Sequence, residues 1–122
     1  MTTATIEKQV VKVGDIFYTS WGYDQTNVEF FKVVRATEKS IWVQETGQII
    51  SGSKYDYWQT SSNGEALVRE YRDHETGEVV KKIAPIEIHR IQYSGGVPCF
   101  TINSFSNGYF WDGKPKHAST GH

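Results

Sequence analysis

The stretch SWGYDQTN, residues 20–27, holds the side chains of this sequence that are best suited to binding a ligand. Trp21 and Tyr23 offer aromatic faces on which a base, a peptide or a cation can stack. The side chains that follow donate and accept hydrogen bonds, and they belong to Asp24, Gln25, Thr26 and Asn27. Because eight residues are more than a tight hairpin turn requires, we predict a ligand-binding loop here.

The same residues are also typical of an ordinary connection between two strands. Gly22 can adopt a positive φ, and Asp24 or Asn27 can form Asx turns with nearby backbone amides. Both interpretations stay open at the level of the sequence.

Three further tryptophans and a C-terminal segment complete the predicted ligand surface. Trp42 and Trp58 lie in the middle of the chain, and Trp111 is followed by Asp112 and Lys114 in the segment WDGKP. If Trp111 packs back on the protein, this segment lies beside the 20–27 loop and completes a groove. Aromatic residues make up 14% of the chain, so we expect most of the other rings to fill the hydrophobic core.

Catalysis is the alternative to binding. Asp24 could join Asp15 and Glu29 in a carboxylate cluster of the kind that metal-dependent nucleases and hydrolases use. However, Asp15 follows Gly14 as part of a turn, and Glu29 fits an outward position on a strand. We therefore expect no catalytic residue, no bound metal and no cofactor.

Charge and composition narrow the choice of partner. The chain has 13 Lys and Arg against 14 Asp and Glu, and no segment forms the basic stripe that non-specific binding to phosphates requires. Four cations (Arg69, Arg72, Lys81 and Lys82) could contact phosphates if they shared one face of a hairpin. A protein partner is therefore expected first and single-stranded nucleic acid second.

The compartment is indicated by what the chain contains. Cys99 is the only cysteine, which precludes an intramolecular disulfide, and we expect it to be a buried, inert thiol. No apolar run approaches the roughly 18 residues of a membrane span, and the first residues do not resemble a signal peptide. We expect a soluble protein of the cytoplasm that does not bind membranes.

The elements that position these residues are predicted to be short strands. Segment 28–36 has charges at every third residue, as in an amphipathic helix, but its β-branched and aromatic residues favour a strand, with a bulge at Phe30–Phe31. Segments 67–72 and 79–84 flank HETGE and predict a hairpin with Gly77 in its turn. Segment 51–64 is polar and is expected to be a long loop.

The resulting fold class is all-β. We predict a small SH3-like barrel or sandwich of about seven short strands, separated by Gly, Pro and Asn turns. Residues 1–122 are expected to form a single domain. Within it we expect a loose N-terminal leader (1–9), a β-domain (10–112) and a flexible tail (113–122).

Two resemblances bear on function. Residues 11–47, with GDIFY, a polar-aromatic loop, FFKVV and a strand containing Trp42, resemble the SH3-like small barrels of the KOW and Tudor types. GDIFY, SWGYDQTN, FFKVV, WDGKP and the final Gly-His also resemble a family of short, uncharacterised proteins of bacteriophages and other mobile elements. This second resemblance implies a binding module that recognises a host macromolecule in the bacterial cytoplasm, for example a defence factor. Nothing in the sequence fixes the oligomeric state.

Overall fold

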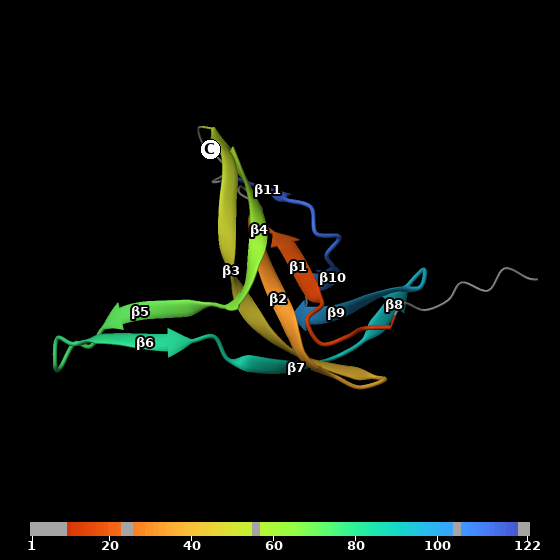
Figure 1. Ribbon diagram of the computed structural model, residues 1–122, viewed down its shortest axis with the longest axis horizontal. Helices are drawn as coiled ribbons and strands as arrows, with labels where there is room; N and C mark the ends of the chain where they lie inside the picture. The colour runs from red at the N-terminus through yellow and green to blue at the C-terminus, as the bar shows by residue number, and fades with distance from the viewer. Residues whose placement is uncertain (1–9, 23–25, 55–56, 104–105, 120–122) are drawn as a thin grey trace, which may run out of the picture.

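The computed structural model describes residues 10–22, 26–54, 57–103 and 106–119, and it confirms an all-β protein. Those residues contain eleven strands rather than the seven expected from the sequence. The strands are β1 (Ile16–Trp21), β2 (Asn27–Ala36), β3 (Ser40–Lys54), β4 (Tyr57–Ala66), β5 (Val68–Arg72), β6 (Val79–Ile83), β7 (Ile86–Arg90), β8 (Gln92–Ser94), β9 (Val97–Asn103), β10 (Ser106–Phe110) and β11 (Lys116–Ser119). Nine of them form one antiparallel sheet that curls into a half-barrel (Figure 1).

Strand β3 organises this sheet. The sheet runs in the order β11-β4-β3-β2-β1-β10-β9-β8, and β7 adds to β3 as a branch. β2 pairs with residues 41–45 of β3, β7 with residues 40–44, and β4 with residues 46–54. Because β2 already occupies one edge of β3 over residues 41–45, β7 must take the opposite edge.

The sheet has a hydrophobic core on each face. The larger core is built around Phe17, Phe31 and Phe100, whose rings meet edge to face at centroid distances of 5.2 Å (Phe17–Phe100) and 6.2 Å (Phe31–Phe100). The smaller core consists of Val28, Phe30 and Ala118, with Trp58 and Trp111 packed against it.

The predicted bulge at Phe30–Phe31 was wrong. Both rings are buried because β2 is covered on one face along its first half and on the other face along its second half. The register with β1 is continuous through both residues, and the irregularity in β2 lies between Val33 and Arg35, against β3. Strand alternation therefore never slips at the two phenylalanines.

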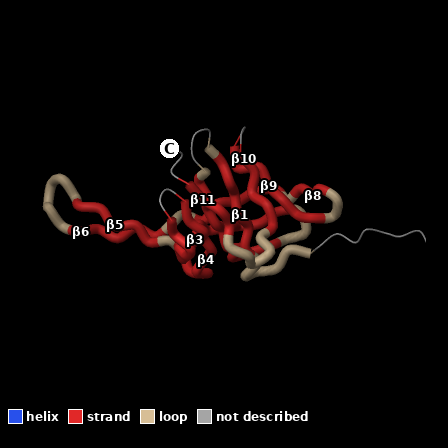
Figure 2. Tube along the Cα trace, turned by 90° about the horizontal axis from the view of Figure 1, so that it is seen from above, coloured by secondary structure: helices blue, strands red, loops and turns tan. Residues whose placement is uncertain are grey.

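The predicted hairpin around HETGE is confirmed, and it leaves the main sheet. β5 and β6 pair with each other as a separate two-stranded sheet, which projects from the body in both views (Figures 1 and 2). We call residues 67–85 the arm. It is inserted at one point of the β3 edge, since Ala66 of β4 lies opposite Thr46 and Ile86 of β7 lies opposite Gln44.

Two further segments differ from expectation. Most of segment 51–64, predicted as a loop, belongs to β3 and β4, because Thr60 is fully buried and Trp58 packs on the smaller core. Part of the segment expected as a tail forms β11, which pairs with β4 and buries Ala118.

A candidate ligand groove

The predicted loop meets the C-terminal strand at its end. Thr26 and Ser119 exchange backbone hydrogen bonds, with N···O distances of 3.2 Å from Thr26 N and 3.1 Å from Ser119 N. Trp21 lies opposite Asn27 in the β1–β2 pairing and is 45% exposed. Tyr23, Asp24 and Gln25 lie outside the described residues.

Three of the predicted residues line one open hollow of about 410 Å³. Thr26 and Asn27 come from the start of β2, and Trp58 comes from β4. Eight other residues complete the lining, namely Val28, Glu29, Glu45, Gln48, Ile50, Leu67, Arg69 and Ala118. We call this hollow the groove; it brings an aromatic ring, amides and charges of both signs together between β2, the β3–β4 hairpin and the base of the arm.

Hydrogen bonds fix one wall of the groove. Gln48 Nε2 donates to Val28 O at 2.7 Å, and the buried Thr60 hydroxyl donates to Gln48 Oε1 at 2.5 Å. Gln48 therefore ties β2 to the β3–β4 hairpin with both ends of its amide. The position of Ile50, two residues further along the same face of β3, follows from this anchoring.

The charges of the groove lie where the arm meets the sheet. Arg69 Nη2 lies 3.6 Å from Glu45 Oε2. Burial raises the pKa of the Glu45 carboxyl and the nearby Glu29 charge raises it further, while Arg69 opposes both effects. A pair of carboxylates beside Trp58 is suited to a cationic group, and the amides of Asn27 and Gln48 are suited to a peptide backbone.

The segment after Trp111 forms a compact turn. Trp111 Nε1 donates to Lys114 O at 2.8 Å, and Lys114 N donates to Asp112 Oδ1 at 2.9 Å. This backbone hydrogen bond lowers the pKa of the exposed Asp112 carboxyl, and Lys116, 3.7 Å away, contributes to the same effect. The Trp111 ring meets Phe30 edge on at 5.0 Å. Trp111 thus packs on the smaller core beside Trp58, and Asp112 and Lys114 hold the turn that follows it.

Trp42 lies elsewhere on the sheet. It is opposite Ile88 of β7 and Arg35 of β2, and the Arg35 guanidinium lies 4.5 Å above its ring. It is absent from the lining of the groove, so the structure does not bring it together with Thr26, Asn27 and Trp58.

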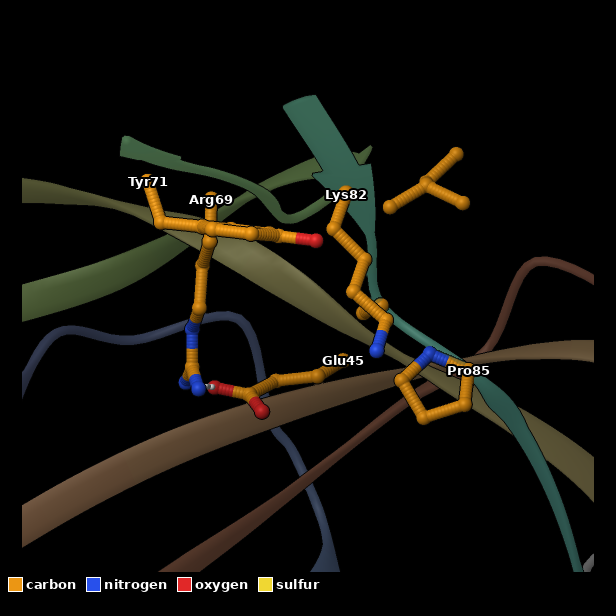
Figure 3. Close-up of a pocket in the computed structure, with 7 residues that line it drawn as sticks. Glu45, Arg69, Tyr71, Lys82 and Pro85 are labelled. Carbon is orange, nitrogen blue, oxygen red and sulfur yellow. Dashed lines mark ion pairs between the residues drawn. The ribbon is translucent and has the colours of Figure 1, made fainter. Parts of the chain in front are cut away.

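A second hollow, of about 270 Å³, lies under the arm. Arg69 and Lys82 extend from the arm toward the sheet, where Glu45 and Pro85 lie, and Tyr71 closes the outer side (Figure 3). Arg69 and Lys82 are directly opposite each other in the β5–β6 register, so they share a face with Tyr71, whereas Arg72 and Lys81 occupy the other face. The four cations therefore do not form one basic face.

The groups considered for catalysis are dispersed where the structure describes them. Asp15 Oδ2 accepts a hydrogen bond from Lys12 N at 2.8 Å within a turn, as the sequence predicts. Glu29 lines the groove, and Asp24 lies outside the described residues. No group of three or more His, Cys, Asp or Glu side chains in the described ranges is arranged to hold a metal ion.

Sequence reasoning missed several residues of the groove. Glu45, Gln48, Ile50 and Arg69 belong to it only because the arm returns to β3 beside the β3–β4 hairpin. The only local signal was the apolar pair Ile49–Ile50 inside a polar stretch, which indicates one exposed apolar side chain whichever face is buried.

No family model matches the chain, and neither a curated protein nor a solved structure is significantly similar to it. Among the residues described, no helix has the length and apolar character needed to cross a membrane.

Proposed function

We propose that this protein is a non-enzymatic binding module of a bacteriophage or other mobile element, acting on a host protein in the bacterial cytoplasm. The observation that carries the proposal is the groove, in which Thr26, Asn27 and Trp58, from separate strands, line one open hollow. Membership of the phage-type family and closure of the curled sheet into an SH3-like barrel are parts of the same proposal.

The lining favours a protein segment as the ligand. Ile50 is 61% exposed and supplies an apolar surface next to the Trp58 ring. Gln48 and Asn27 supply amide groups, and Glu29 supplies a carboxylate beside the Arg69–Glu45 pair. A peptide that presents an apolar side chain and a basic side chain satisfies these groups together.

A matched pair of variants tests the proposal. Ile50→Asp places a charge in the groove, whereas Ile49→Asp places the same charge on the opposite face of β3, at a residue of similar exposure (56%). Each tagged variant is used to capture proteins from bacterial lysate, and the captured protein is then purified and titrated with the three chains. We expect the wild type and Ile49→Asp to bind it and Ile50→Asp to lose binding. Equal binding by both variants would contradict the groove as the site.

Single-stranded nucleic acid is the second candidate. The observation that favours it is the shared face of Arg69, Tyr71 and Lys82, where one ring could stack a base between two cations. Tryptophan fluorescence and mobility shift with single-stranded and duplex oligonucleotides test it, and affinity should fall as salt rises. A product gel with Mg²⁺ in the same series tests the metal-dependent hydrolase that Asp24 would serve, because cleavage would overturn the non-enzymatic proposal.

A further inference from the structure

The arm carries a charge pattern that is complementary to itself. Its outer strand and the next residue have the sequence Arg69-Glu70-Tyr71-Arg72-Asp73. Counted outward from Tyr71, each charge has the opposite charge at the same distance on the other side. When two such segments are aligned antiparallel about Tyr71, Arg69 faces Asp73 of the second copy, and Glu70 faces Arg72 of the second copy.

Only Tyr71 gives this result as a centre. A two-fold axis at Glu70 or at Arg72 would place that charge against the same charge of the other copy. Like charges directly opposite each other destabilise a strand pair, and opposite charges stabilise it. The pattern therefore specifies one register for self-association through β5.

The edge that this pairing needs is open in the described part of the chain. β5 pairs with β6 along one edge, and no described strand pairs with its other edge. Asp73 N donates to Glu78 O at 2.9 Å, so Asp73 directs its backbone groups toward the β6 side of the hairpin. Because this direction alternates along a strand, Glu70 and Arg72 direct theirs toward the open edge. These are the two residues that would pair by backbone hydrogen bonds across a two-fold axis at Tyr71.

The side chains on the arm are also available. Tyr71 is 51% exposed, and every residue of β5 is exposed. The contacts that the charged residues make within one chain are at the surface: Glu70 with Lys81 at 3.6 Å, and Arg72 Nη1 donating to Gly77 O at 2.9 Å. Surface contacts of this kind contribute little and can be exchanged for others.

We propose that two copies of this chain pair through β5 in antiparallel orientation about Tyr71, giving a four-stranded sheet with β6 on each outer side. Such an interface is isologous, since the same patch serves both copies. It also gives the ribbon the additional strands that an isolated two-stranded hairpin lacks. The dimer would carry two grooves, and this inference does not depend on what the grooves bind.

Charge reversal and its repair test the register. Glu70→Lys places a cation against Arg72 of the second copy, and Arg72→Glu places two carboxylates together; each change acts twice across the two-fold axis. In the full chain carrying both substitutions, the opposite charges face each other again. Glu75→Lys, in the exposed turn of the arm, is the control for a change of net charge. Sedimentation equilibrium over a range of protein concentrations measures the dissociation constant, and circular dichroism checks that each variant is folded.

We expect the wild type and Glu75→Lys to dimerise, each single reversal to raise the dissociation constant roughly tenfold or more, and the double variant to return near the wild-type value. A wild type that stays monomeric at the highest concentration would overturn the proposal. So would single variants that dimerise normally, or a double variant that stays monomeric while folded.

Discussion

Phe30 and Phe31 are neighbours in the sequence, but their buried rings lie in two different hydrophobic cores. Phe31 packs with Phe100 in the larger core, whereas Phe30 packs with Trp111 in the smaller one, beside the groove. Strand β2 thus connects the core that holds the sheet together with the core that supports the candidate site.

Truncation of these two rings should separate the roles of the two cores. We expect Phe30→Ala and Phe31→Ala each to lower the free energy of unfolding by about 3–5 kcal/mol, since both remove a large buried side chain. Only Phe30→Ala should change the emission of Trp111, whose ring it contacts at 5.0 Å. Urea denaturation followed by tryptophan fluorescence measures both effects. An equal change in Trp111 emission in Phe31→Ala, seen against Trp111→Phe backgrounds, would show that the cores are not independent.

Gly108 should tolerate no side chain. It lies opposite Phe100 in the β9–β10 pairing, and a Cβ on it would collide with the buried Phe100 ring. We expect Gly108→Ala to lower the free energy of unfolding by about 1–3 kcal/mol through overpacking.

Gly47→Ala is the matched control for this substitution. Its Cβ would lie 2.6 Å from Nδ2 of the exposed Asn63 side chain, which can move aside. Denaturation midpoints of the two variants should differ clearly. Equal stability would mean that Phe100 can shift without cost.

Glu45 should make stability depend on pH. Because burial and Glu29 raise its pKa in the folded state above the ordinary value of 4.5, the folded chain holds this proton more tightly than the unfolded chain does. The resulting stabilisation is complete below about pH 4.5 and is lost as pH rises through the raised folded value.

Glu45→Gln removes this dependence. The wild-type free energy of unfolding, minus that of Glu45→Gln, should fall as pH rises from about 4 to about 7, whereas Glu78→Gln in the exposed arm should show no such trend. Urea denaturation at each pH provides the values. A difference that rises over this range would mean that the exposed Arg69 pair outweighs burial.

The arm should be dispensable for folding of the main sheet. Val68 lies opposite Ile83, so an Asn-Gly turn in place of residues 69–82 closes the hairpin at its base. Only exposed contacts are lost, and we expect a change of about 1 kcal/mol or less in the free energy of unfolding. Denaturation at a protein concentration that keeps the wild type monomeric measures this change. Loss of a cooperative transition would show that the arm is structural.

The sequence predicted the elements whose patterns are local. Alternating apolar residues and the HETGE turn identified the arm, and β-branched and aromatic residues identified β2 as a strand. Segment 51–64 was misassigned because Ser, Gly and Gln dominate it, and its strand conformation depends on Thr60 and Trp58 packing against residues far away in the chain.

The candidate site was predictable only in part for the same reason. Thr26, Asn27 and Trp58 stood out by residue type, but their proximity depends on β11 and on the long β3–β4 hairpin, neither of which has a strong local signal. Glu45 and Arg69 meet because the arm is inserted beside them, and no spacing in the sequence expresses that contact.

The most direct test of ligand binding in the groove is fluorine NMR of the full chain labelled with 5-fluorotryptophan. The four tryptophans give four resonances, which Trp→Phe variants assign. The host protein captured by the wild type is then added in increasing amounts. We predict that the Trp58 resonance shifts or broadens with the bound fraction while that of Trp42, on another part of the sheet, stays in place. Binding that leaves Trp58 unchanged, or that perturbs Trp42 instead, would contradict the proposed site.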